Sequence, residues 1–248
     1  MKVKTYFSAA EAEGAEVHAD VAVVIDVIRA TTVIVEALAS GAGAIYPSAS
    51  TEDAIRLANS LGREDTLLCG ERKGLKVEGF DLGNSPREFT PERVKGKRLV
   101  MSTTNGTRAF LAAQPADRVV ALTFPNLTTV AEAVAGADTL TLICAGKEGR
   151  FSLDDALCAG LLLRELASGA HGEIADFELN DQARAALSFA DAFPTDAPFL
   201  RRTAAGAALV EIGLDDDLHI CAERDRHALL PEMRDRTIRL ARGAGGSG

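Results

Sequence analysis

The stretch VAVVIDVIRATTVIVEALAS, residues 21–40, decides the fold class of this sequence. Its first part, Val21–Val27, is apolar at every position except Asp26, as expected of a strand that is buried on both faces of a sheet. A helix is expected over Thr32–Ser40, and Gly41 directly after it is typical of a helix C-cap. A buried strand followed by a helix is the unit from which parallel α/β sheets are built.

The same unit recurs along the chain. Further strands are expected over Ala44–Pro47, Thr66–Cys69, Arg98–Ser102, Arg118–Leu122 and Thr139–Cys144. Further helices are expected over Ser50–Ser60, Thr107–Ala113, Leu127–Ala135, Leu153–Ser168, Asp181–Ala192 and Arg202–Ile212, and a last extended segment over Leu218–Ala222. Repeated strand–helix units predict a three-layer α/β/α fold with a mainly parallel central sheet. Because no Pro/Ser-rich linker divides the chain, residues 1–242 are interpreted as one domain and 243–248 (GAGGSG) as a flexible tail.

The bulk composition excludes several classes of protein. The chain has 248 residues, of which 47% are apolar and 25% charged, so disordered and fibrous classes do not apply. The formal net charge of −9 argues against a nucleic-acid partner, which would require a clustered basic surface. No apolar run approaches the roughly 18 residues that cross a bilayer, and the first ten residues do not resemble a signal peptide. We therefore expect a cytoplasmic protein with no membrane partner, and a homodimer only as the commonest soluble oligomer.

Ligands of an open parallel sheet bind beyond the carboxyl ends of its strands. The first strand ends in DVIRATT, residues 26–32. Burying the Asp26 carboxylate is costly unless a cation compensates it, and either Arg29 or a metal ion could do so. Thr31 and Thr32, with the first N–H groups of the following helix, would bind an anion. A purely structural Asp–Arg pair with a threonine N-cap explains the same residues, and the sequence leaves both interpretations open.

The strand Arg98–Ser102 runs into TTNGTR, residues 103–108. Hydroxyl and amide side chains gather there around a glycine at the start of a helix, which is typical of a phosphate-binding loop. An ordinary capped turn has a similar composition, but the density of hydroxyl groups favours the phosphate site. The expected phosphate ligands are Thr103, Thr104, Asn105, Gly106 and Thr107, and Arg108 would add a bidentate contact.

The strand Thr66–Cys69 opens a glycine-rich loop, Gly70–Ser85. Glu71 and Asp81 on this loop would suit Mg²⁺, a hard cation that takes one or two protein carboxylates and keeps several waters. Arg72 adds positive charge for an anionic substrate. Solvated surface charge is the alternative interpretation of these residues.

The strand Thr139–Cys144 is followed by AGKEGR, residues 145–150, and then by Asp154 and Asp155 at the start of a helix. The spacing Cys–five residues–Arg is that of the cysteine phosphatases, in which a thiolate attacks phosphorus. No His precedes Cys144, and buried thiols are common, so a packed thiol is favoured. Asp155 is a further candidate metal ligand.

Together these motifs resemble the 2-phosphosulfolactate phosphatases. They follow the family's order over roughly residues 1–240, namely DVIRATT (26–32), GER (70–72), GFDLGNSP (79–86), TTNGTR (103–108), CAG (144–146), FSLDD (151–155) and the closing pattern Asp217-Leu218…Cys221…Asp225…Pro231. Ile28 and Asp154 stand where the family pattern has Leu and Glu. The resemblance implies Mg²⁺-dependent hydrolysis of 2-phospho-3-sulfolactate to 3-sulfolactate and phosphate, a step toward coenzyme M, in a three-layer α/β/α fold. It also implies substrate contacts from Asn84, Ser85 and Gly146.

The working hypothesis is therefore a Mg²⁺-dependent phosphatase for a small phosphorylated anion. Metal ligands are expected from the carboxylates Asp26, Glu71, Asp81 and Asp155. Contacts to phosphate, carboxylate or sulfonate oxygens are expected from Arg29, Arg72 and Arg108. Attack by water is favoured over a phosphoenzyme, because residue 28 is Ile and the DxD pair of haloacid-dehalogenase-type phosphatases is incomplete. The alternatives are a phosphatase for another small phosphorylated hydroxy acid and a non-catalytic protein that binds a phosphorylated anion.

Overall fold

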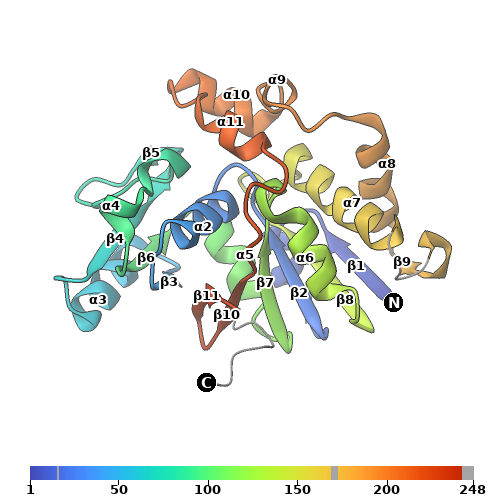
Figure 1. Cartoon of the computed structure of the whole chain (residues 1–248), viewed down its shortest axis with the longest axis horizontal. Coiled ribbons are helices and arrows are strands. Elements are labelled where there is room, and N and C mark those ends of the chain that lie inside the picture. The colour runs from blue at the N-terminus through green and yellow to red at the C-terminus, as the bar shows by residue number, and fades with distance from the viewer. Residues whose placement is uncertain (16, 169–172, 242–248) are drawn as a thin grey trace.

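The computed structural model describes residues 1–15, 17–168 and 173–241. Within this part of the chain, eleven strands form one mixed, mostly parallel sheet covered by helices, which confirms the predicted α/β class (Figure 1). In sheet order the strands are β5 (Leu75–Lys76), β4 (Thr66–Arg72), β6 (Arg98–Ser102), β3 (Ala44–Pro47), β11 (Thr237–Leu240), β10 (Pro231–Arg234), β7 (Arg118–Leu122), β2 (Val21–Ile25), β8 (Thr139–Cys144), β1 (Lys2–Tyr6) and β9 (Glu178–Leu179).

The sheet consists of two parallel groups joined by an antiparallel hairpin. Strands β4, β6 and β3 pair in parallel, and so do β7, β2, β8, β1 and β9. The β10–β11 hairpin lies between the groups, where β10 pairs with β7 and β11 pairs with β3 at Ile238 and Ile45. The hairpin, and not direct pairing of β3 with β7, therefore makes the junction between the two groups.

Helices cover both faces of the sheet. They are α1 (Ala9–Glu13), α2 (Ala30–Ala39), α3 (Thr51–Leu61), α4 (Pro91–Val94), α5 (Gly106–Ala112), α6 (Leu127–Val134), α7 (Leu153–Ser168), α8 (Asp181–Ala192), α9 (Ala197–Leu200), α10 (Ala204–Glu211) and α11 (Asp217–Ala222), with 3-10 turns η1 (Pro86–Glu88), η2 (Phe124–Asn126) and η3 (Ile174–Asp176). Side chains alternate between the two faces along a strand. Val23 and Ile25 of β2 share one core with α6, α7 and α8, whereas Ala22 and Val24 share the other with α1, α2 and α5. This is the predicted three-layer arrangement.

Helices α9, α10 and α11 form a cap, which we call the cap helices (residues 197–222), at the top of Figure 1. Phe199, Leu209 and Leu218 join the cap helices to the core beneath them. The β4–β5 hairpin approaches the cap from the other parallel group, because a Cβ built on Gly74 would lie 2.8 Å from Cδ1 of Ile212. The cap helices therefore contact both parallel groups.

The segment Leu218–Ala222 is helical, so the predicted extended segment there is wrong. Leu218 and Cys221, three residues apart, lie with Asp217 on the buried face of α11. The short alternation of apolar residues in this segment resembles that of a strand, and a helix of one or two turns is too short to show its own period. The sequence interpretation also missed β1 and the β10–β11 hairpin, because polar residues interrupt both and neither forms a continuous apolar run.

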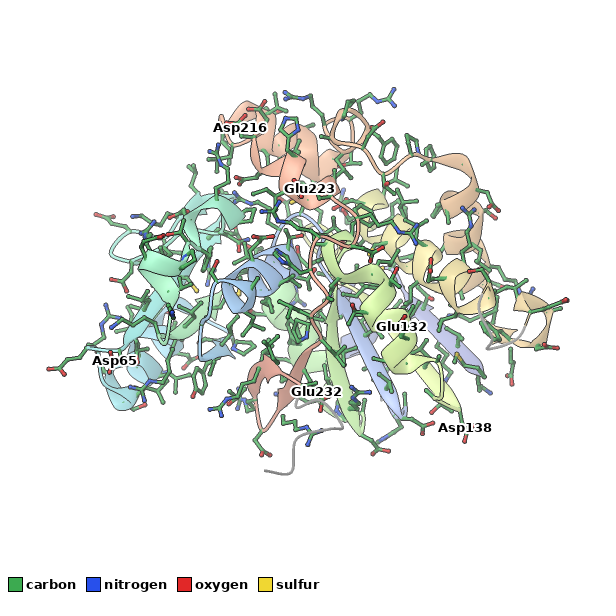
Figure 2. All side chains as sticks on the ribbon, viewed as in Figure 1. Asp65, Glu132, Asp138, Asp216, Glu223 and Glu232 are labelled. Carbon is green, nitrogen blue, oxygen red and sulfur yellow. The ribbon has the colours of Figure 1, made fainter. Side chains whose placement is uncertain are left out.

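The predicted tail, residues 243–248, lies outside the described residues, and the single domain over 1–242 stays a prediction. No helix in the described ranges is both long and apolar enough to cross a membrane. The acidic side chains of Asp65 and Asp138 lie at the periphery of the molecule (Figure 2) and that of Glu132 is exposed, in keeping with the net charge of −9.

Candidate active site

Asp26 is a buried carboxylate directly after β2. Its Oδ1 accepts a hydrogen bond from the Ala30 N–H at 3.1 Å, and its main-chain N–H and C=O both bond to the Thr31 hydroxyl. Burial, together with the negative charges of Asp154 and Glu71, raises the pKa of Asp26 to about 7. A cation bound beside this group would offset both its burial and the repulsion between the carboxylates.

Asp155, in the first turn of α7, ties the ends of two neighbouring strands together. Its two carboxylate oxygens accept the Val27 N–H at 2.9 Å and the Gly146 N–H at 3.0 Å. Burial raises the pKa of Asp155 well above its ordinary value, and the charges of Asp154 and Asp26 add to this. Since main-chain N–H groups occupy both oxygens, Asp155 holds the backbone of the site in place.

Asp154 is the neighbouring carboxylate and is 1% exposed. Its Oδ1 accepts the Ser152 hydroxyl at 2.6 Å. Burial raises the pKa of Asp154, and the positive charge of Lys147 opposes this rise. The negative charge of Asp154, like that of Glu71, contributes to the raised pKa of Asp26, and we call Asp26 and Asp154 the acidic pair.

Glu71, near the end of β4, brings the second parallel group to the same place. Its Oε1 accepts the Thr104 N–H and its Oε2 accepts the Gly74 N–H, both at 2.7 Å. It therefore fixes both the loop after β6 and the turn between β4 and β5. Gly70, before it, lets β4 approach β6 closely: its φ is +146°, and a Cβ there would lie 2.0 Å from the Ser102 carbonyl oxygen.

The TTNGTR loop, residues 103–108, connects β6 to α5 and packs directly on Asp26. A Cβ at Gly106 would lie 2.6 Å from the Ala30 Cβ and 2.8 Å from Asp26 Oδ2, so no larger residue fits there without displacing the start of α2 or the carboxylate. The Thr103 and Thr107 N–H groups each donate to the hydroxyl of the other residue, both at 3.2 Å, and these bonds fix the loop. The start of α5, where N–H groups have no partner within the helix, is thus held beside a carboxylate.

Arg29 precedes α2 and is 4% exposed. Its Nη1 donates to Asp217 Oδ2 at 2.7 Å, and its Nη2 donates to the Gly74 carbonyl oxygen at 2.6 Å. The ion-pair partner of Arg29 is therefore Asp217. The sequence had suggested Asp26, but α11 brings Asp217, a second buried carboxylate, to the Arg29 guanidinium. The positive charge of Arg29 still opposes the rise in the pKa of Asp26.

Arg72, the last residue of β4, is partly buried and anchored to the end of β6. Its Nη1 donates to the Ser102 carbonyl oxygen at 3.1 Å and its Nη2 to the Ser102 hydroxyl at 2.9 Å. The guanidinium group thus lies just before the TTNGTR loop. Buried carboxylates, two fixed guanidinium groups and the start of α5 meet at one place, which suits a metal ion and a phosphorylated anion.

The family model for 2-phosphosulpholactate phosphatase matches residues 6–236 of this chain. The chain belongs to the 2-phosphosulpholactate phosphatase family. Curated relatives named probable 2-phosphosulfolactate phosphatase come from Gloeobacter violaceus, 41% identical over 217 residues (86% of this chain, 88% of the relative), and Thermus thermophilus, 40% identical over 222 residues (88% and 90%). A third, from Clostridium beijerinckii, is 34% identical over 239 residues (96% and 99%). These findings confirm the resemblance and place the chain among the phosphoric monoester hydrolases.

The acidic pair of this 2-phosphosulpholactate phosphatase family member fits Mg²⁺. In the described part of the chain, no three His, Cys, Asp or Glu side chains are already grouped as a metal site. Mg²⁺ needs no such group, because it takes one or two carboxylates and completes its shell with waters and substrate phosphate. Asp26 and Asp154 provide hard oxygen donors of this kind, at a place where burial and mutual repulsion disfavour their charges.

Two predicted site residues are bound elsewhere in this family member. Arg108 forms a bidentate contact with Glu13 of α1 at 2.9 and 2.6 Å. It lies two residues after Gly106 in α5, so its side chain projects from a different face of the helix. Asp81 accepts the Leu68 N–H at 2.7 Å and pairs with Arg63. Leu68 precedes Glu71 by three residues in β4. Asp81, which is bound at Leu68, is therefore roughly 10 Å from Glu71 along the strand. The structure does not bring these side chains to the acidic pair.

Thr31 and Thr32 are fully buried, and their hydroxyl groups form hydrogen bonds with neighbouring groups. The Thr31 hydroxyl bonds to the Asp26 main chain, and the Thr32 hydroxyl donates to the Val27 carbonyl oxygen at 2.8 Å and lies 2.7 Å from the Thr123 hydroxyl. Both residues therefore shape the turn after β2 and do not present their hydroxyl groups to a ligand.

The other predicted substrate contacts line the surrounding loops. The Ser85 hydroxyl donates to Asp217 Oδ1 at 2.6 Å. Asn84 is 5% exposed, and its Oδ1 is buried without a hydrogen-bond partner among the described residues. Gly146 has a φ of +70° and no room for a Cβ, which would lie 2.2 Å from the Arg150 carbonyl oxygen. Asn105 accepts the Glu148 N–H at 3.1 Å, which joins the TTNGTR loop to the loop after β8.

Cys144 is completely buried at the end of β8, which confirms the packed thiol that the sequence favours. Burial raises the pKa of the Cys144 thiol well above its ordinary value. A thiol in this state is a poor nucleophile, because only the thiolate attacks phosphorus.

The sequence interpretation named Asp154 and Asp217 as parts of motifs but gave neither of them a role in the site. Asp154 adjoins Asp155 on a helix, and the phase of that helix decides which of the two faces the site. Asp217 belongs to the acidic run Asp215–Asp217, which resembles a solvated turn. Its helical spacing from Cys221 is the signal that would have marked it as buried.

Proposed function

We propose that this chain is a Mg²⁺-dependent phosphatase that hydrolyses 2-phospho-3-sulfolactate to 3-sulfolactate and phosphate, a step toward coenzyme M. The names of its relatives support the substrate, and the acidic pair supports the metal. The absence of membrane-spanning helices in the described residues and the family's small phosphorylated substrate agree with the expected cytoplasmic enzyme.

The contact between Asp26 and Gly106 carries this proposal. It places a carboxylate that favours a cation against the start of α5, where the N–H groups not already bound within the TTNGTR loop would bind phosphate oxygens. A protein that only binds an anion gains nothing from buried carboxylates beside that anion, because they repel it. A metal ion between carboxylate and phosphate removes this conflict, which is why the geometry favours catalysis over simple binding.

The residues of the site have separable roles in this proposal. Asp26 and Asp154 would hold Mg²⁺, which when bound supplies positive charge to the phosphate oxygens and activates water. Glu71 keeps the TTNGTR loop in register with them through the Thr104 N–H. At the start of α5 the Thr107 N–H already donates to the Thr103 hydroxyl, and the other N–H groups of this first turn would donate to the phosphate.

Arg29 and Arg72 would bind the remaining anionic groups of the substrate. Each guanidinium has five N–H donors, and the contacts described above leave several of them for carboxylate, sulfonate or phosphate oxygens. Fixed guanidinium groups lose little freedom on binding, so they stabilise charge more effectively than mobile ones. A substrate with three anionic groups explains why an acidic protein concentrates arginines here.

The decisive experiment is phosphate release from 2-phosphosulfolactate, measured with Mg²⁺ and again with EDTA. We expect release that requires Mg²⁺, and its loss in Asp26→Asn. Asp138→Asn is the matched control, because it makes the same change at an exposed position. No release by a folded wild-type protein would reject the substrate, and a panel of phosphorylated hydroxy acids without the sulfonate would then test the related phosphatase activity.

A further inference from the structure

Asp217 is a completely buried carboxylate that lies outside all the loops discussed for catalysis. It comes from α11, one of the cap helices, and its oxygens are shared by three donors. Arg29 Nη1 lies 2.7 Å from Oδ2, while the Ser85 hydroxyl and Arg87 Nε lie 2.6 and 3.2 Å from Oδ1. The side chains of Arg29 and Asp217 are 2% and 0% exposed, so water does not screen their attraction.

The second anchor of Arg29 is also held in place. The Gly74 carbonyl oxygen, which accepts from Nη2, belongs to a residue whose N–H is bound by Glu71 Oε2 at 2.7 Å. The same residue packs against Ile212 at the end of α10. The guanidinium is therefore fixed between the cap helices on one side and the β4–β5 hairpin on the other.

We propose that Asp217 is a positioning residue for the phosphatase reaction: it orients the Arg29 guanidinium so that the free N–H donors of Arg29 meet the substrate anion. This rests on the proposed function, and adds to it a role for a residue that does not itself touch substrate. An arginine side chain has several rotatable bonds, and two anchors at opposite terminal nitrogens restrict it to one orientation. Donors that are already oriented stabilise the charge that develops in the transition state, whereas mobile donors must first be ordered.

The test compares purified full-length variants by kcat, KM and melting temperature. Asp217→Glu keeps the charge but lengthens the side chain, so it displaces the guanidinium without leaving Arg29 unpaired. We expect a fall in kcat/KM of about 30-fold, most of it in kcat, with little change in melting temperature. Asp138→Glu is the matched control: it makes the same change at an exposed position outside the cap helices, and its activity should equal that of the wild type.

A double-mutant cycle separates positioning from an independent contribution. If Asp217 acts through Arg29, then Arg29→Ala/Asp217→Asn is no less active than Arg29→Ala alone. Losses that multiply in the double variant would overturn the proposal, and so would wild-type kinetics in a folded Asp217→Glu. Should Asp217→Asn fail to fold, Asp217→Glu carries the test, because it retains the buried charge.

Calorimetric titration with inorganic phosphate distinguishes this proposal from the proposed function. If wild-type protein binds phosphate but releases none from 2-phosphosulfolactate, the substrate assignment fails and the positioning role is still measured. Asp217→Glu should then bind phosphate about tenfold more weakly than wild type and Asp138→Glu. Equal affinities in all three proteins would overturn the positioning role alone.

Discussion

Gly106 and Asp26 come from different parallel groups of the sheet, yet the α-carbon of one lies against the carboxylate of the other. A Cβ at position 106 would stand 2.8 Å from Asp26 Oδ2, closer than side chains normally approach. The contact aligns Asp26, after β2, with the loop after β6. The geometry of catalysis therefore depends on a residue that has no side chain.

Gly106→Ala is expected to reduce kcat/KM by at least about 100-fold, because the added methyl group displaces either Asp26 or the start of α5. The same overpacking should cost about 1–3 kcal/mol of stability. Gly136→Ala is the control, since a Cβ there meets nothing within 4 Å. Equal kinetics for the two variants would show that the close approach is unimportant.

Asp26→Asn should abolish turnover and at the same time stabilise the metal-free protein at pH 8. The pKa of Asp26 rises from 3.8 to about 7 on folding, so folding favours its protonated form. The protonated Asp26 carboxyl therefore contributes fully to the free energy of unfolding below about pH 4, and this contribution is lost as the pH rises through 7. The free energy of unfolding changes by up to about 4 kcal/mol over this range. Melting curves in EDTA at pH 5 and pH 8 test this. The variant and wild type should differ at pH 8 and agree more closely at pH 5.

Mg²⁺ should raise the melting temperature more at pH 8 than at pH 6. Binding requires ionised carboxylates, and the pKa of Asp26 is about 7, so metal and protons compete for the same group. Thermal shift assays with and without MgCl₂ across this range measure the effect. A shift that is equally large at pH 6, or equally large in Asp26→Asn, would place the metal elsewhere.

Arg108→Ala should change kcat/KM by less than about threefold, because Arg108 is paired with Glu13 on the surface. Arg72→Ala, by contrast, removes a guanidinium that is fixed over the end of β6, and should lower kcat/KM by about 100-fold. Steady-state kinetics of the two variants side by side decide between the position predicted from the motif and the position in the structure. A large loss in Arg108→Ala would restore the motif-based prediction.

Cys144→Ser should retain most of the activity. The thiol is buried in the sheet, where its raised pKa keeps it protonated, and it is not needed as a nucleophile. A melting curve recorded with the kinetics controls for the added polar group in the core. If the folded variant released no phosphate, the metal-dependent mechanism would be wrong.

The fold was predictable where a strand is buried on both faces. The apolar run before Asp26 and its repeats at β6, β7 and β8 identify strands without tertiary information. The β10–β11 hairpin was not predictable in this way, because Glu232 and Arg234 interrupt its apolar pattern. Glu232 is buried and pairs with both Arg234 and Arg118 of β7, and the second of these is a contact that no local pattern contains.

The site was predictable as a set of loops but not as a set of contacts. The carboxyl ends of β2, β4, β6 and β8 do carry the residues that the structure brings together. Asp154 and Asp155 are both buried but accept hydrogen bonds from different groups, and the partner of Arg29 is Asp217, which comes from a distant segment. These relationships arise from packing between segments far apart in the sequence, so they emerge only in three dimensions.

The β10–β11 hairpin is synthesised late, and this has a consequence for the assembly of the sheet. Residues 231–240 are translated after every other strand of the sheet, yet they join its two parallel groups. Until these residues are synthesised, the strand pairing that joins the group carrying Glu71 to the group preceding Asp26 cannot form. The strand edges that the hairpin covers therefore stay unpaired until late in synthesis. The catalytic site is complete only when translation has almost ended.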